Sequence, residues 1–225
     1  MLGTIVNTGT ILTGTVIGSV VRKGIKEEYQ GALFTAMGLA ATGLGINAVV
    51  QNMSKSNYPV LFIISLAVGS LIGTMLDLDG KFQKLSSRFS SSKLGEGLST
   101  GILLYCIGTL SILGPVNSAL YGDNTYLFTN ATLDLVTSAV LASTYGIGMA
   151  LAAPVLFLWQ GSIYCLTLLL GNFMTADMMT EISVVGGFLI ASSGLSILGI
   201  KNCKTLNMLP CLFVPVVWFI IISFI

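Results

Sequence analysis

Apolar stretches of close to 20 residues recur along the whole chain, separated by short polar stretches. As a helix, one such stretch crosses the roughly 30 Å hydrocarbon core of a membrane. The pattern therefore predicts an all-α, polytopic transmembrane bundle that forms one domain, residues 1–225. The expected spans number about eight: 2–21, 31–50, 58–78, 96–113, a segment 132–174 divided into two helices at Pro154, 182–200 and 209–225.

Two of these apolar segments resemble each other. Residues 101–117 read GILLYCIGTLSILGPVN and residues 186–202 read GGFLIASSGLSILGIKN, so both contain SILG followed three positions later by Asn. Small and aliphatic residues also match easily by chance, which is the alternative explanation. We interpret the pair as a duplicated membrane helix, because internal repeats of this kind reveal architecture.

The basic residues predict how the spans are oriented. If the N-terminus lies outside and there are eight spans, all ten Lys and Arg residues except Lys55 fall on the inner side. Such a bias sets the orientation of membrane helices. Both termini are then outside, and segments 101–117 and 186–202 cross in opposite directions. Inverted repeats are typical of secondary transporters, which bind substrate near the midplane.

Glycines four residues apart mark two expected contact faces, Gly14 with Gly18 and Gly69 with Gly73. This spacing lets helix backbones approach closely in lipid. We expect these faces to pack helices and offer them as candidate contacts of a homo-oligomer.

Residues 80–94 differ from the spans. Phe82, Leu85 and Phe89 fall on one helical face with basic residues around them. This pattern favours an amphipathic helix lying in the membrane surface. A solvated basic loop is the alternative.

Composition strengthens the membrane assignment and removes several chemistries. The chain is 54% hydrophobic and 8% charged, whereas soluble domains carry about 25% charged residues. The net charge of +1 suggests no nucleic-acid partner. Histidine, the commonest general base and metal ligand, is absent, and the four cysteines lack CxxC spacing. We therefore expect no enzyme activity, no metal and no cofactor, and partners limited to lipid, a small solute or ion, and further copies of the chain.

Polar residues within membrane spans are costly and are functional candidates for that reason. Asp134 stands in the fifth expected span, where a carboxyl can bind a proton or a cation. The alternative is an interfacial acid favoured by the helix dipole near a helix N-terminus. Glu96 opens the fourth span and has the same alternative, as a first-turn acid beside Lys93.

Two Gly-containing stretches, Thr144–Gly148 and Gln160–Ser162, fall near the centres of the fifth and sixth spans. Such residues at membrane depth suit broken helices whose freed backbone groups hold a substrate or ion. Close helix packing with one interhelical hydrogen bond is the alternative. Asn7 either ends a helix or lines a pathway. The candidate binding residues are Asn7, Glu96, Asp134, Thr144, Gly146, Gln160 and Ser162.

Several short motifs resemble the prokaryotic membrane family called "domain of unknown function 554". The resemblance spans essentially the whole chain and departs from the family pattern at 8–13. The motifs are Met1–Asn7, Glu96-Gly97, Cys106-x-Gly108, Leu133-Asp134, Ser143–Gly148, Gln160–Ser162, Gly186-Gly187 and Leu206–Pro210. The resemblance implies a bacterial or archaeal inner-membrane protein that is at most a candidate transporter, without naming a substrate. It places Glu96, Asp134 and Gln160 in characteristic motifs.

The leading hypothesis is ion-coupled secondary transport of a small solute, driven by H⁺ or Na⁺. Asp134, Gln160 and the region around Gly146 would form the midplane site. A passive channel is one alternative, and it requires a continuous polar pore. A scaffold or regulatory membrane protein that transports nothing is another, and its polar residues would only pack helices.

Overall fold

The computed structural model describes residues 1–21, 26–87, 98, 101–102, 105–106, 109–171 and 175–223. Within these residues all regular structure is helical and no strand occurs, which confirms the all-α class. The elements are α1 (Leu2–Val20), α2 (Glu27–Met53), α3 (Leu61–Met75), α4 (Leu78–Ser87), α6 (Thr109–Tyr121), α7 (Thr125–Tyr145), the 3₁₀ helix η1 (Ile147–Leu151), α8 (Ala152–Leu170), α9 (Ala176–Ile197), α10 (Thr205–Met208), the 3₁₀ helix η3 (Leu209–Leu212) and α11 (Phe213–Ile222).

In the described part of the chain, four helical stretches are long and apolar enough to cross a membrane. They are Glu27–Met53, Ile147–Leu169, Ala176–Ile197 and Thr205–Ile222. Helix α3 is apolar but shorter. Helices α1 and α7 have 19 and 21 residues and are not among the four; both carry several Thr and Asn residues. Eight spans thus stay a prediction.

The helices form two compact units, and each unit combines two separate stretches of sequence. Unit 1 contains Met1–Leu33 and Gln83–Gly171, and unit 2 contains Phe34–Phe82 and Asn172–Ile225. One copy of the repeated segment therefore falls in each unit: 101–117 in unit 1 and 186–202 in unit 2.

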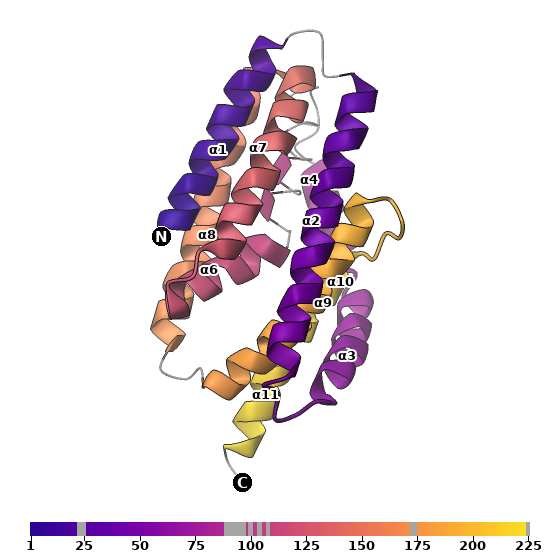
Figure 1. Cartoon of the computed structure of the whole chain (residues 1–225), viewed down its shortest axis with the longest axis vertical. Helices are drawn as coiled ribbons and strands as arrows, with labels where there is room; N and C mark the ends of the chain where they lie inside the picture. The colour runs from indigo at the N-terminus through magenta and orange to yellow at the C-terminus, as the bar shows by residue number, and fades with distance from the viewer. Residues whose placement is uncertain are drawn as a thin grey trace. The chain divides into compact units, whose positions relative to one another are not determined.

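In unit 1, α1 lies alongside α7 and also contacts α8 (Figure 1). A Cβ atom added at Gly18 would lie 2.8 Å from the carbonyl carbon of Ala139, and one at Gly14 would overlap the Leu135 carbonyl oxygen. Only residues without a side chain allow this approach. Near the other end of the two helices, Gly3 meets Leu127. Residues later in α1 therefore contact residues later in α7, so the two helices run parallel.

The two faces of α1 have opposite characters. The buried face carries small and polar residues together with one aliphatic residue, and the outward face carries large apolar side chains such as Leu2, Val16 and Val20. A helix of a soluble protein buries its apolar face instead. The arrangement fits a helix surrounded by lipid on its outer side. The buried residues are Gly3, Thr4, Asn7, Ile11, Gly14, Thr15 and Gly18.

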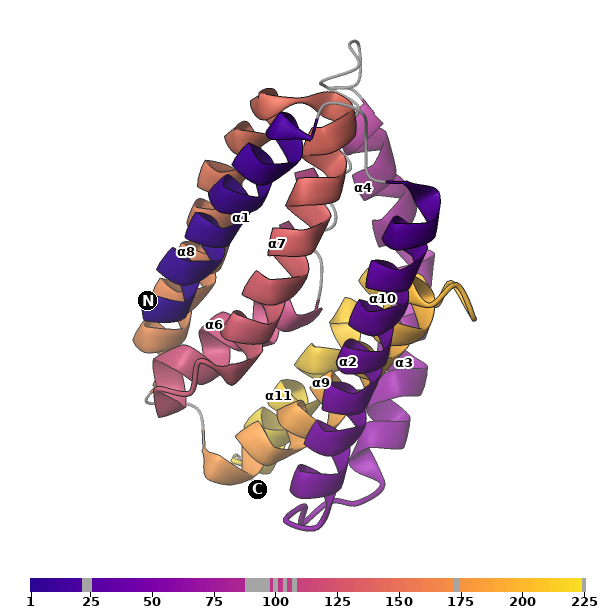
Figure 2. The same ribbon diagram turned by 45° about the horizontal axis from the view of Figure 1, so that its top comes forward.

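Unit 2 contains two glycine crossings of the same kind, and Figure 2 shows α2, α3 and α9 side by side. Gly45 of α2 faces Gly187 of α9, while Gly38 faces Gly194. Residues later in α2 thus face residues earlier in α9, so these two helices are antiparallel. The glycines have no Cβ atoms, so these backbones also meet directly.

The second crossing of unit 2 joins α3 to the α10–η3 segment. Gly69 faces Cys211 and Gly73 faces Asn207, so this pair is also antiparallel. All four glycines predicted to pack helices, at 14, 18, 69 and 73, thus make contacts within the chain. Their suggested role as homo-oligomer contacts is wrong, because these faces are already covered.

The boundary between α7 and α8 differs from the prediction. Helix α7 begins at Thr125 and ends at Tyr145, and it is followed by Gly146, whose φ of +88° favours glycine. The expected division at Pro154 is wrong, because Pro154 lies in the first turn of α8. Proline is tolerated there, since first-turn N–H groups have no intrahelical partner.

The fourth predicted helix was placed at 96–113, but α6 continues through Pro115 to Tyr121. Proline lacks an N–H, so the Ser111 carbonyl loses its usual helical partner. Glu96 and Arg88–Lys93 lie outside the described residues. The predicted surface helix 80–94 is thus described only as far as Ser87, where α4 ends.

The last two predicted helices begin earlier than expected. Helix α9 starts at Ala176 instead of 182, capped by Thr175, whose hydroxyl accepts the Met178 N–H at 3.2 Å. Side-chain caps of this type stabilise helix N-termini. Helical structure at the C-terminal end starts at Thr205 rather than 209, with a 3₁₀ turn around Pro210.

Candidate functional site

Asp134 lies in the middle of α7 and is 4% exposed. Asn130, one turn earlier and equally buried, donates from Nδ2 to the Asp134 Oδ2 at 3.0 Å. Because α7 begins at Thr125 rather than 132, Asp134 is nine residues into the helix. The interfacial first-turn position that was the alternative is therefore wrong.

Asn7 of α1 is fully buried and interacts with the Asp134 carboxylate across the α1–α7 contact. Its Nδ2 has no partner at hydrogen-bonding distance. Thr10 occupies the other side of the asparagine, because its hydroxyl donates to the Asn7 carbonyl oxygen at 2.7 Å and more weakly to Oδ1 at 3.4 Å. Asn7 thus lines the interior of unit 1 beside Asp134.

Other buried polar atoms in unit 1 also lack partners. Leaving a buried donor or acceptor unpaired costs about 1–3 kcal/mol, so such atoms call for water, an ion or a ligand. Among the side chains that the structure describes, every buried N or O atom without a hydrogen bond belongs to unit 1. These atoms are Thr4 Oγ1, Asn7 Nδ2, Thr15 Oγ1, Tyr105 OH and Gln160 Oε1.

Asp134 has no cationic partner on the helices around it. The sequences of α1, α6, η1 and α8 contain neither Lys nor Arg. Its ionisable neighbours are Tyr105 and Cys106, which are both buried. A buried carboxylate without a counter-charge is costly. The site therefore suits a bound proton or a cation.

Gln160 is fully buried in α8, where its Nε2 donates to the Ser111 Oγ at 2.9 Å. A Cβ atom added at the neighbouring Gly161 would lie 3.9 Å from the Met1 side chain, so this contact is at the N-terminal end of α1. Gln160 and Asp134 thus occupy the same unit but have separate hydrogen-bond partners. The predicted break at Gln160–Ser162 is wrong, because α8 is continuous there. Ser162 is exposed and donates to the Trp159 carbonyl.

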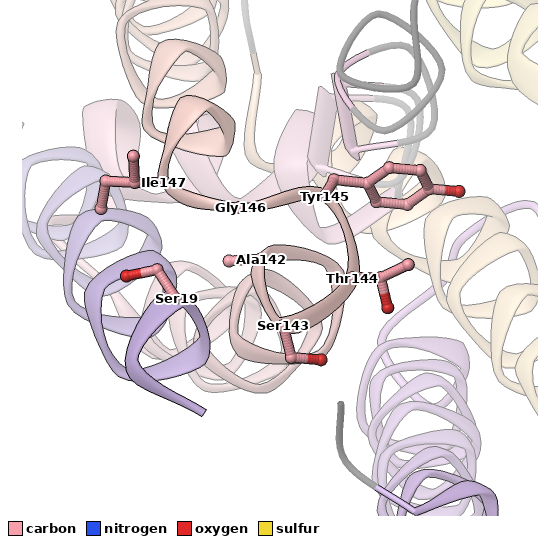
Figure 3. A pocket seen from close by; sticks show the side chains of 7 residues that line it. All are labelled: Ser19, Ala142, Ser143, Thr144, Tyr145, Gly146 and Ile147. Atoms are coloured by element: carbon pink, nitrogen blue, oxygen red, sulfur yellow. The ribbon is translucent and has the colours of Figure 1, made fainter. Parts of the chain in front are cut away.

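Thr144 and Gly146 line a pocket at the other end of α1 and α7 (Figure 3). The pocket is open, has a volume of about 520 Å³, and is lined by Ser19, Ala142, Ser143, Thr144, Tyr145, Gly146 and Ile147. Figure 3 shows the Tyr145 ring pointing away from Ser19. Gly146 forms the turn between α7 and η1, so the predicted interruption at Thr144–Gly148 is present, but it lies at the end of α7 and not at the centre of a helix. The lining contains hydroxyl groups and no charged residue.

Sequence reasoning missed two kinds of site residue. Asn130 precedes Asp134 by four positions, and this spacing places both on one helix face; the error in the start of α7 concealed it. Tyr105 and Thr15 gave no sequence signal, because only packing shows that a hydroxyl is buried without a partner.

A second buried acid, Glu181, lies in α9 of unit 2, one residue before the expected start of that span at 182. It accepts hydrogen bonds from the Ser56 hydroxyl at 2.5 Å and the Tyr58 N–H at 3.3 Å. This carboxylate anchors the loop before α3. In the described parts of the chain, no three His, Cys, Asp or Glu residues gather as metal ligands.

Comparison with known proteins gives a family but no activity. The chain is 57% identical to the "Uncharacterized membrane protein YdfK" of Bacillus subtilis, over 100% of this chain and 98% of that protein. It is 29% identical to the "Uncharacterized protein YqgA" of Escherichia coli, over 94% of this chain and 93% of that one. No solved structure matches it. The family model "Protein of unknown function (DUF554)" matches residues 2–220. The chain therefore belongs to the DUF554 family of membrane proteins, as its motifs predicted.

Proposed function

We propose that this protein is a secondary transporter that moves a small solute across the bacterial or archaeal inner membrane, coupled to H⁺ or Na⁺. The observation that carries the proposal is Asp134, a buried carboxylate without a cationic partner on the neighbouring helices. Acids placed this way in membrane helices typically lie on ion or proton pathways. Two unpartnered polar atoms beside it, Asn7 Nδ2 and Tyr105 OH, supply further binding groups.

The proposal includes eight spans with both termini outside: α1, α2, α3, the helix that ends at Tyr121, α7, α8, α9 and α10–α11. The packing directions support this order. Spans one and five, α1 and α7, should run parallel, and they do so in unit 1. Spans two and seven should be antiparallel, as should spans three and eight, and the glycine crossings of unit 2 have those directions.

Inverted repeats form the mechanical part of the proposal. Segments 101–117 and 186–202 fall in different units, as expected if alternating access moves one repeat against the other. The glycine pairs of α1 and α3 do not support an inverted repeat. Helix α1 packs parallel to α7, whereas α3 packs antiparallel to the α10–η3 segment. A homo-oligomer is also proposed, and it would use a surface outside these glycine faces.

The test is ligand-dependent stability of the purified protein. We would measure the melting temperature with a panel of small solutes, with and without Na⁺, at several pH values. A solute at 100 times its Kd stabilises the folded state by about 2.7 kcal/mol, which raises Tm by about 5–11 °C in a chain of this length. Asp134→Asn should abolish the shift. The matched control is Asp177→Asn, which removes an exposed acid of α9 and should retain it.

The identified solute is then used in proteoliposome uptake. Uptake should require a proton or sodium gradient and should be lost in Asp134→Asn. Flux that ignores both gradients would favour a passive channel instead. Uptake that is unchanged in both Asp134→Asn and Gln160→Ala would refute the assigned site. Absence of any uptake would favour a scaffold, in which the polar residues only pack helices.

A further inference from the structure

The pocket at the end of α7 is in line with Asp134. Ala142 forms part of the pocket, and Ser138 and Asp134 follow it at intervals of four residues toward the middle of the helix. Residues spaced by four share one helix face. Eight residues at 1.5 Å each separate the pocket from the carboxyl group by about 12 Å along the axis.

Hydroxyl groups occupy the interval between pocket and acid. Ser138 is fully buried. Tyr105 is also fully buried, and it interacts with both Ser138 and Asp134. The Tyr105 hydroxyl has no partner at full hydrogen-bonding distance. On α1, Thr15 is buried and unpartnered one turn before Ser19, which lines the pocket. Groups that can both donate and accept hydrogen bonds therefore lie in the interval between the pocket and Asp134, and the Ser138 hydroxyl itself donates to the Leu135 carbonyl oxygen at 3.0 Å.

The same interval is too tightly packed for a hydrated ion. Gly14 contacts Ser138 and the Leu135 carbonyl, and Gly18 contacts the Ala139 backbone, so α1 and α7 touch without intervening side chains. A proton needs no such opening, because it moves by exchange between hydrogen-bonded oxygens. The seam between α1 and α7 therefore selects for a proton.

The groups that face Asp134 also favour a proton over a metal cation. Asn130 presents its amide N–H to the carboxylate, and Asn7 presents an amide with an unpartnered Nδ2. Hard cations bind oxygen atoms instead. Among the described residues around Asp134, Tyr105 and Cys106 are titratable, α6 contains only Tyr121 at its last position, and α1 and η1 contain no titratable side chain.

We propose that the coupling ion is a proton. Asp134 exchanges this proton with the pocket at the end of α7 through Ser138 and Tyr105. A hydronium ion in the pocket releases a proton to a hydroxyl oxygen, which gives up its own proton to the next oxygen. The last transfer forms an O–H bond on Asp134 and neutralises its charge. Release runs in reverse, and no other reactant is consumed. This inference rests on the proposed transport function.

The first measurement is infrared difference spectroscopy of the solute-free protein in lipid. A protonated carboxyl group gives a carbonyl band that an ionised carboxylate lacks. We expect a band that decreases as pH rises and is absent in Asp134→Asn. Asp177→Asn should leave it unchanged. Melting temperatures of the same samples with and without Na⁺ provide the comparison for a cation, and Na⁺ should have no saturable effect.

The second measurement tests the route. Transfer to D₂O shifts the carboxyl band as deuterium replaces the proton, and the rate of this shift reports access to Asp134. Tyr105→Phe and Ser138→Ala should slow the exchange about 100-fold, the low end of what a positioned proton-transfer group contributes. Controls are Tyr164→Phe and Ser162→Ala on α8, which remove the same groups away from the seam. Tm of each variant monitors folding.

The outcomes separate this inference from the transport proposal. An Asp134 band with exchange slowed only by the seam variants supports the proton route. An Asp134 band whose exchange is unaffected by both seam variants overturns the route. If the band is absent, and Na⁺ stabilises the protein but not the Asp134→Asn variant, the proton is not the coupling ion. Ion-coupled transport then remains in place with Na⁺ as the ion. Absence of both overturns the inference and removes the observation on which the transport proposal rests.

Discussion

The close contact between α1 and α7 at Gly18 predicts that Gly18→Ala destabilises the protein. The new Cβ would lie 2.8 Å from the carbonyl carbon and 2.9 Å from the Cα of Ala139. The Ala139 carbonyl oxygen would be closer still. Carbon atoms pack best at about 3.5–4.0 Å apart, so the two backbones must separate by roughly 0.6–1.2 Å at least. Backbone atoms in a helix cannot rotate away as the end of a flexible side chain can. The two helices must therefore move apart along the seam.

The matched control is Gly9→Ala in the same helix. Nothing lies within 4 Å of a Cβ added at Gly9, which is exposed. Both variants gain the same helix propensity, about 0.8–1.0 kcal/mol in favour of alanine. This gain cancels when the variants are compared with each other. The remaining difference is the cost of overpacking, about 1–3 kcal/mol.

The assay is thermal unfolding of the two purified variants in the same detergent. For a chain of 150–250 residues, 1 kcal/mol changes Tm by about 2–4 °C. Gly18→Ala should therefore melt about 2–12 °C below Gly9→Ala. Unit 2 offers an independent pair, Gly45→Ala against Gly43→Ala, because a Cβ at Gly45 would lie 2.7 Å from Ala191 Cα and Gly43 is open.

Equal melting temperatures for Gly18→Ala and Gly9→Ala would refute the reasoning. They would mean that α1 and α7 do not touch through their backbones at Gly18. The narrow seam that favours a proton over a hydrated ion would then lose its structural basis. A drop for Gly45→Ala alone would limit the error to unit 1.

Three further predictions concern single hydrogen bonds. Ser111→Ala leaves the buried Gln160 amide without its acceptor and should cost about 1–3 kcal/mol, measured as a fall in Tm that Ser162→Ala does not share. Glu181→Gln keeps the shape of the side chain but weakens its bonds to Ser56 and Tyr58; it should cost about 1 kcal/mol, and unchanged Tm would mean that these bonds do not hold the loop. Asn207→Ala removes the acceptor of the Asp79 N–H, now 2.8 Å away, and should speed hydrogen exchange at the start of α4 while leaving α1 unaffected.

Much of the fold followed from local properties of the sequence. Hydrophobic content and helix-length apolar stretches determine a membrane protein made of helices, because an isolated backbone in lipid must satisfy its own hydrogen bonds. The Gly14–Gly18 and Gly69–Gly73 spacings identified helix faces that pack closely, since spacing by four is a property of one helix. The short motifs taken together, Leu133-Asp134 among them, were also sufficient for the family.

Helix ends and partners required the tertiary structure. The position of Pro154 suggested a break, but the chain turns at Gly146, because proline is harmless in a first helical turn and only glycine readily adopts a φ of +88°. The same limit applied to the oligomer contacts, since a Gly-x-x-x-Gly face does not specify whether its partner belongs to the same chain.

The sequence by itself determined that Asp134 lies in a helix at a place where a charge is costly. It did not determine what surrounds that charge. Asn7 and Tyr105 come from parts of the chain far from α7 in sequence, and only packing brings them to the carboxyl group. Burial and the absence of a counter-charge are properties of several helices together. A pattern along one helix cannot encode them, so only the tertiary structure shows what surrounds Asp134.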